Sequence, residues 1–258
     1  MRGSCSGRTY GSSMSETNGM LPPPPPVTPS SWTTDQFMRK ETLSPALSVW
    51  LQVVLYVAAA SSALSGIGIL MAASAAERFF ESDSYRNLDD WVAAEDFYAT
   101  FLGLLYLVSI AVFVLLIVFL FRAHKACATI WSGPRKWSRG WTVGAWFIPF
   151  ANAIITPMVW VETDRISSAR RTDGQVAEDW RQLPINKQIV CWWVLYAVAY
   201  FGLLVGFGGM DTEEFGYSDY PNFARFTAVA AFLMGAALVL AALSVRRIGR
   251  ALSPSAIG

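Results

Sequence analysis

Four long runs without a charged residue constrain this chain more than any other feature of its sequence. They cover residues 46–76, 97–121, 188–209 and 226–245. About 20 consecutive apolar residues are enough for a helix to cross the hydrocarbon core of a bilayer. Inside that core only helices and closed barrels satisfy all of their backbone hydrogen bonds. We therefore predict an all-α, polytopic membrane protein with four transmembrane helices.

The overall composition agrees with this prediction and excludes an ordinary soluble domain. Hydrophobic residues make up 53% of the chain and charged residues only 15%, whereas soluble domains carry about 25% charged residues. The net charge is +1, and no basic surface is concentrated enough to favour nucleic acid as a partner. The lipid bilayer is the expected surroundings.

The distribution of charge predicts how the spans are oriented. If residues 137–161 do not cross the membrane, three of the 20 Lys and Arg residues lie outside and 17 lie inside. If that segment crosses, ten lie on each side. Loops that stay in the cytoplasm are enriched in Lys and Arg, so the four-span arrangement is favoured. It places both termini in the cytoplasm and the protein in the cell membrane, with acidic outer loops at residues 77–96 and 210–225.

Two tails flank the predicted membrane domain of residues 46–250. Residues 1–45 are rich in Gly, Ser, Thr and Pro and include the run Pro22–Pro26. Such a composition cannot bury enough apolar surface to fold, so we predict a disordered cytoplasmic tail. Its proline run is either a plain spacer or a polyproline segment that docks on a partner. Residues 251–258 form a short cytoplasmic tail.

The segment between the second and third spans, residues 137–161, is apolar but interrupted. Gly140, Gly144, Pro149 and Pro157 break its helical pattern. Irregular backbone cannot face lipid, so the segment is expected to lie at the membrane interface or to re-enter the bilayer as a loop. Five tryptophans between residues 131 and 160 favour the interface, where tryptophan is enriched. Both arrangements stay open.

The same segment carries a recognisable pattern. Residues 139–152 read Arg-Gly-Trp-Thr-Val-Gly-Ala-Trp-Phe-Ile-Pro-Phe-Ala-Asn, after Arg122-Ala123-His124 and before Pro157. This resembles the bacterial membrane family called domain of unknown function 4328, which is common in actinobacteria. The resemblance covers residues 46–250 and departs from the family at Arg139, where a proline is usual. It implies a four-helix membrane protein with a signature between the second and third spans, and no established activity.

The candidate functional residues come from this segment. Its aromatic and basic side chains suit a membrane surface, where aromatic rings sit at headgroup depth and cations meet anionic lipid. Asn152 either caps the broken helix or binds a ligand. The only histidine, His124, is interpreted as an interface residue. The candidates are Arg122, Gly140, Trp141, Gly144, Trp146, Phe147, Pro149, Asn152 and Pro157.

Small residues at four-residue spacing predict close helix packing. They are Ala58, Ser62 and Gly66 in the first span and Gly202 and Gly206 in the third. Packing within one chain is the simpler interpretation, and a homo-oligomer formed through the same faces is the alternative.

No catalytic residue, cofactor site or metal site is predicted. Cys5, Cys127 and Cys191 are far apart in sequence and form no ligand motif, and no span contains an ionisable residue of the kind that proton-coupled transport uses. We expect a non-enzymatic platform for a membrane or cytoplasmic protein partner, or for lipid headgroups on the cytoplasmic face. The alternative is a passive channel or small-solute transporter that uses residues 137–161. A membrane enzyme with Glu162 or Asp164 in its site is a third hypothesis.

Overall fold

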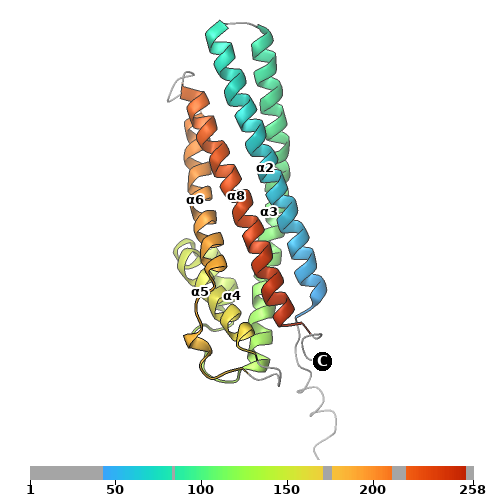
Figure 1. The fold of residues 1–258 in the computed structure, drawn as a ribbon, viewed down its shortest axis with the longest axis vertical. Helices are drawn as coiled ribbons and strands as arrows, with labels where there is room; N and C mark the ends of the chain where they lie inside the picture. Colours follow the sequence, from blue (N-terminus) through green and yellow to red (C-terminus); the bar gives the residue numbers. More distant parts are fainter. Residues whose placement is uncertain (1–42, 83–84, 171–175, 211–218, 254–258) are drawn as a thin grey trace, which may run out of the picture. The chain divides into compact units, whose positions relative to one another are not determined.

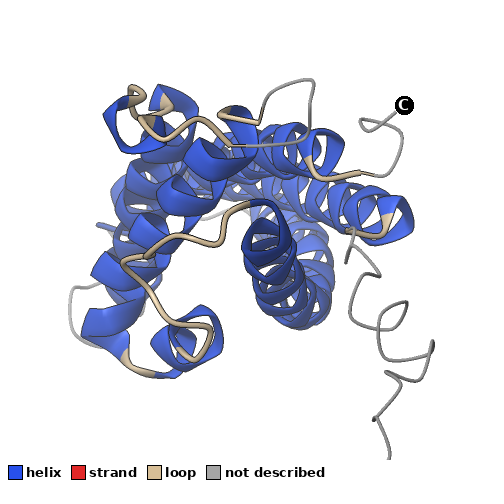
Figure 2. Cartoon of the chain, turned by 90° about the horizontal axis from the view of Figure 1, so that it is seen from below, coloured by secondary structure: helices blue, strands red, loops and turns tan. Residues whose placement is uncertain are grey.

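Four long helices contain the four uncharged runs (Figure 1). The computed structural model describes residues 43–82, 85–170, 176–210 and 219–253, and in it these helices are α2 (Pro45–Ser82), α3 (Tyr85–Ile130), α6 (Lys187–Met210) and α8 (Tyr220–Ala251). Each is long and apolar enough to cross a membrane. Figure 2 shows only helices and connecting loops over this described part of the chain. The all-α prediction with four candidate spans is confirmed.

The four helices pack in the order α3, α2, α8, α6. Helix α2 lies along both α3 and α8, and α8 lies along α6. Helices α3 and α6, at the two ends of this order, make little or no direct contact within the described residues. A gap therefore remains between α3 and α6.

Small residues bring the helix backbones close together. The Ser62 hydroxyl of α2 donates a hydrogen bond of 2.8 Å to the Ala231 carbonyl of α8. A Cβ atom on Gly66 would lie 3.2 Å from the Phe232 ring. Four of the five residues that we predicted to mediate helix packing contact α8: Ser62 and Gly66 from α2, and Gly202 and Gly206 from α6. The fifth, Ala58, is buried on α2.

The acidic segment 77–96 differs from the expected loop. Apart from residues 83 and 84, which lie outside the described part of the chain, its residues belong to the last turns of α2 and the first turns of α3. The segment contains no Gly or Pro, so its acidic residues give it charge without breaking the helices. Asn87 of α3 stabilises the end of α2, because its amide donates hydrogen bonds to the Arg78 carbonyl at 3.2 Å and to the Ser82 hydroxyl at 2.6 Å. The loop prediction was wrong here.

The segment predicted to be broken forms three short pieces. They are α4 (Trp141–Gly144), the 3-10 turn η1 (Ala145–Phe147) and α5 (Pro149–Ser168). Pro149 begins α5, as prolines often do, but Pro157 lies inside a continuous helix. The prediction that Pro157 breaks the segment was wrong. Helix α5 is not among the candidate spans.

Trp193 explains how α5 tolerates Pro157. A proline has no N–H group, so the carbonyl four residues earlier in the helix loses its backbone partner. That carbonyl belongs to Ala153, and the indole Nε1 of Trp193 on α6 donates a hydrogen bond to it at 3.2 Å. A side chain of the neighbouring helix therefore replaces the missing donor.

Helix α5 lies between α3 and α6 at one end of the gap. The Trp160 ring of α5 stacks on Phe119 of α3 at 5.6 Å and meets Trp192 of α6 at 5.8 Å. The turn before α5 reaches further along the gap, since Trp146 and Phe147 contact Phe113 of α3 with ring centroids 5.6 and 6.1 Å apart. Residue 113 lies well inside the uncharged run of α3.

The two ends of the membrane domain meet. The Leu43 N–H donates a hydrogen bond of 3.3 Å to the Leu252 carbonyl, so the chain enters α2 and leaves α8 at the same end of the bundle. Most of the predicted tails, residues 1–42 and 254–258, lies outside the described residues. The domain extends slightly further than predicted, because α2 already begins at Pro45 and Leu43 and Leu252 are buried.

Candidate functional site

A basic pocket lies where the loop after α3 meets α5, η2 (Trp180–Gln182) and the start of α6. Its volume is about 410 Å³. Three cationic side chains, one carboxylate and two tryptophans line it together with five apolar residues. The lining consists of Lys136, Trp137, Pro157, Met158, Val161, Glu162, Arg165, Trp180, Arg181, Ile185 and Val190. We call this the basic pocket.

Aromatic rings hold two of the three cations in place. The Lys136 ammonium lies 5.3 Å from the centroid of the Trp137 ring, and the Arg181 guanidinium lies 4.8 Å from that of Trp180. Arg181 also donates a hydrogen bond to the Pro134 carbonyl. The Nε atom of Arg165 is buried and has no hydrogen-bond partner among the described residues. A donor without a partner in a pocket is available to a ligand.

Among the described residues, Glu162 is the only carboxylate in the lining, and it already accepts two hydrogen bonds. Its two oxygens accept hydrogen bonds from the backbone N–H groups of Lys136 at 2.8 Å and Trp137 at 3.3 Å. Its side chain therefore fixes the loop that carries Lys136. Sequence reasoning named Glu162 only as a residue of a hypothetical enzyme and missed this role, because the contact joins residues far apart in the chain.

His124 of α3 also contacts the loop that carries Lys136. The Arg135 guanidinium donates to the His124 carbonyl at 2.9 Å and to its Nδ1 at 3.2 Å, while Nε2 lies 3.2 Å from the Trp137 carbonyl. These contacts fit a neutral ring that is protonated on Nε2. His124 is 2% exposed, so its ring packs inside the protein, and its position at the membrane interface stays a prediction.

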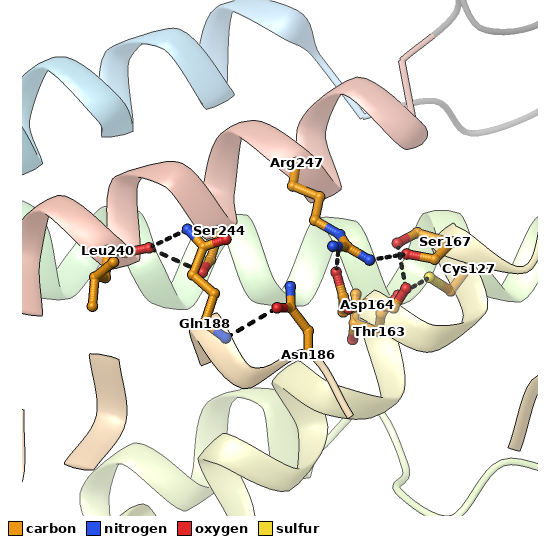
Figure 3. Close-up of polar contacts among 10 residues, drawn as sticks. Cys127, Thr163, Asp164, Ser167, Asn186, Gln188, Leu240, Ser244 and Arg247 are labelled. Carbon is orange, nitrogen blue, oxygen red and sulfur yellow. Dashed lines mark hydrogen bonds and ion pairs between the residues drawn. The ribbon is translucent and has the colours of Figure 1, made fainter. Parts of the chain in front are cut away.

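A second polar cluster joins α5 to α8 and α6 (Figure 3). The Arg247 Nε atom lies 3.1 Å from the Asp164 carboxylate, and its Nη2 atom donates to the Ser168 hydroxyl at 3.1 Å. Burial raises the pKa of Asp164, and the charge of the neighbouring Arg247 opposes that rise. Figure 3 shows Asp164 facing Arg247 across the two helices. This arrangement is a packing contact for α5.

The gap between α3 and α6 holds a second cavity, of about 540 Å³. We call it the α3–α6 cavity. Residues of all four long helices line it, and Trp146 and Asn152 contribute from the η1 turn and the start of α5. Its lining is mainly leucine and aromatic side chains.

Asn152 does not cap α5. The N-cap position is Ile148, and no side chain accepts the first N–H groups of the helix. The Asn152 Oδ1 atom is buried without a hydrogen-bond partner in the described structure. Of the two alternatives for this residue, capping was wrong. Asn152 instead lies in the wall of the α3–α6 cavity.

The remaining candidate residues lie in different parts of the structure. Gly140 precedes α4, Trp141 and Gly144 belong to it, and Pro149 begins α5. Arg122 is exposed on α3 and lines neither cavity. The predicted candidates therefore do not form one site. Trp146 and Asn152 line the α3–α6 cavity, and Pro157 lines the basic pocket.

The described residues contain no group of three His, Cys, Asp or Glu side chains that could hold a metal ion. Cys127 and Cys191 are free thiols, the first buried and the second exposed. Cys5 lies outside the described residues.

Comparison with known proteins identifies the family. No curated protein and no solved structure matches the chain. A family described as "Domain of unknown function (DUF4328)" matches residues 83–250, which include α3, α4, α5, α6 and α8. The match extends over well more than half of the chain, and the protein belongs to this family of unknown function.

Proposed function

We propose that this integral membrane protein is a non-enzymatic platform whose basic pocket binds the phosphate-bearing headgroup of an anionic phospholipid. The observation that carries the proposal is the imbalance of charge in the pocket. The described lining contains three cations, Lys136, Arg165 and Arg181, and one carboxylate, Glu162. That carboxylate already accepts hydrogen bonds from two backbone N–H groups. Cations at the membrane surface attract anionic lipid with about 1 kcal/mol each.

The apolar part of the pocket supports a lipid rather than a soluble anion. Met158, Ile185 and Val190 line the pocket and are between 43% and 49% exposed. Exposed apolar residues beside cations suit the boundary between headgroups and acyl chains. A lipid would place its phosphate near Arg165 and the first part of its chains against these three side chains.

The orientation of the protein is part of the same proposal. The pocket belongs to the segment between α3 and α6, which the charge distribution assigns to the cytoplasmic side of the cell membrane. The tryptophans of the pocket suit headgroup depth. Both ends of the domain would then lie in the cytoplasm.

The alternative function, a passive channel that uses residues 137–161, has one observation in its favour. Asn152 lines a cavity between the spans. A path for polar solutes needs polar groups along its length, and the lining of the α3–α6 cavity is mainly apolar. The platform is therefore the better supported function.

Native mass spectrometry of the purified full chain tests the proposal. The protein is released from micelles that contain equal amounts of phosphatidylglycerol and phosphatidylcholine. We expect one phosphatidylglycerol to remain bound and expect Arg165→Gln to weaken its binding about fivefold, since one surface cation contributes about 1 kcal/mol. Arg246→Gln is the matched control, because Arg246 is exposed on α8 and lines neither cavity.

Two results would contradict the proposal. One is equal retention of both lipids by the wild-type protein. The other is an equal loss of phosphatidylglycerol in Arg165→Gln and Arg246→Gln, which would indicate a general effect of charge. Competition by soluble glycerol phosphate at the same concentration as the lipid would point to a free phosphate ligand.

A further inference from the structure

The α3–α6 cavity differs from the basic pocket in chemistry and has no role in the function proposed above. No Asp, Glu, Lys, Arg or His among the described residues lines it. Its polar groups are the hydroxyls of Ser109 and of its tyrosines, the amide of Asn152 and the N–H groups of its tryptophans. A ligand of this cavity must therefore be neutral and mainly apolar.

Aromatic rings dominate one side of the cavity. Trp192, Trp193, Tyr196 and Tyr200 follow one another along α6, with successive ring centroids 4.7, 5.9 and 6.1 Å apart. Trp146 faces Phe113 at 5.6 Å on the α3 side. Aromatic rings pack favourably against another ring in stacked or edge-to-face geometry. The cavity wall suits a ligand with a flat ring.

Polar atoms without partners accompany these rings. The indole Nε1 atoms of Trp146 and Trp192 and the Oδ1 atom of Asn152 are buried and make no hydrogen bond in the described structure. Trp192 is only 4% exposed. Buried donors without an acceptor cost about 1–3 kcal/mol each. A ligand that brings acceptor oxygens to the two indoles would remove this cost.

The position of these atoms along the bundle narrows the ligand further. Trp146 contacts Phe113, which precedes the first cation at the end of the α3 run, Arg122, by about 14 Å along the helix. The hydrocarbon core is about 30 Å thick, so the Trp146 ring lies near its middle if Arg122 marks the membrane surface, while Trp192 lies about 8 Å along α6 from Lys187. The ester groups of a phospholipid stay at that surface, whereas a neutral ring with carbonyl groups can reach this depth.

The volume of the cavity is that of a small-molecule site. The cavity holds about 540 Å³. That volume lies in the range of small-molecule sites and admits a single ring with part of a chain.

We propose that the α3–α6 cavity binds a lipid quinone, a neutral carbonyl-bearing ring with an isoprenoid tail. The ring lies beside Trp146 and Trp192, whose N–H groups donate to its oxygens. The tail lies along the apolar side chains of α3 and α6. In the reduced form of the ligand, a hydroxyl also donates to the Asn152 Oδ1 atom.

Native mass spectrometry with a short-tailed menaquinone as the probe tests this inference on the full chain in micelles. We expect saturable binding of one menaquinone per chain. Ser109→Phe should weaken it at least about tenfold, because the residue is exposed and lines the cavity and the larger ring occupies the ligand's place. The matched control is Gly103→Phe, which adds the same ring on α3 outside the lining, where a Cβ meets no atom within 4 Å.

Trp146→Phe tests the position of the ring. It removes one donor and keeps an aromatic side chain, so binding should weaken about two- to tenfold. Leu204→Trp, at a lining residue of α6 that is 56% exposed, repeats the test if Ser109→Phe does not fold. Palmitic acid at the same concentration should not displace menaquinone.

Three outcomes would overturn the inference. They are no retained menaquinone, equal binding in the cavity-filling variants and Gly103→Phe, and displacement by an equal amount of palmitic acid, which would assign the cavity to acyl chains. None of them bears on the basic pocket, whose probe is an anionic phospholipid. Failure of this inference is therefore distinguishable from failure of the proposed function.

Discussion

The hydrogen bond from Trp193 to the carbonyl that Pro157 leaves without a partner can be tested by a double-mutant cycle. Trp193→Phe removes the 3.2 Å bond to Ala153 and keeps an aromatic ring in its place. This bond is exposed, so the expected loss is that of one hydrogen bond. We expect the free energy of unfolding to fall by about 1 kcal/mol, the net contribution of a typical hydrogen bond.

The second arm of the cycle restores a backbone donor. In Pro157→Ala the alanine N–H can bind the Ala153 carbonyl, as in any helix. Trp193→Phe should then cost about 1 kcal/mol less than it does in the wild-type protein, which is the coupling expected of two residues that serve one group. Trp50→Phe is the control, because Trp50 is 64% exposed on α2.

The assay is equilibrium unfolding in mixed micelles, followed by far-UV circular dichroism for all four variants. An equal cost of Trp193→Phe with and without Pro157 would refute the reasoning, since the indole would then not be serving the carbonyl that the proline frees. A cost no larger than that of Trp50→Phe would refute it as well.

Three further predictions concern other parts of the bundle. Gly206→Ala should lower the free energy of unfolding by about 1–3 kcal/mol, because its Cβ would overlap the Thr227 side chain, whereas Gly208→Ala, whose Cβ meets no atom within 4 Å, should be neutral or stabilising in the same assay. The raised pKa of Asp164 means that the folded protein binds a proton more tightly than the unfolded chain. Stability should therefore fall as pH rises from the ordinary aspartate pKa of 3.8 through the raised value, and thermal unfolding between pH 3.5 and about 6.5 should show that this slope is smaller in Asp164→Asn. Glu162→Ala should speed hydrogen exchange at the Lys136 amide at least about tenfold, since the amide loses its buried carboxylate acceptor, and an unchanged rate would contradict the role given to Glu162.

The main architecture could be predicted from the sequence because it depends on local composition. A run such as residues 97–121 has no charge over a length that spans a bilayer, and no tertiary contact is needed to recognise it. The small residues of α2 and α6 were also identifiable from their spacing. Helix ends were less predictable, since charge ends a membrane run without ending a helix, as residues 77–96 show.

The candidate sites were only partly predictable, because their contacts join distant parts of the chain. The segment 137–161 was recognised as unusual from its prolines, glycines and tryptophans, yet the partner of its proline break, Trp193, lies on another helix. Glu162 and Arg165 come from α5, while Arg181 comes from η2. No periodicity in the sequence relates the α5 residues to Arg181, so the basic pocket could not be assembled before the fold was known.

The hydrogen bond between Leu43 and Leu252 also has a consequence for how the protein can organise other molecules. The membrane domain therefore begins and ends at the same point of the bundle. Anything held by the segment before residue 43 and anything held by the segment after residue 253 would be tethered to that same point. Two ligands bound in this way would be held near each other, at an effective concentration set by the lengths of the two segments. The helix bundle itself would not need to contact either ligand.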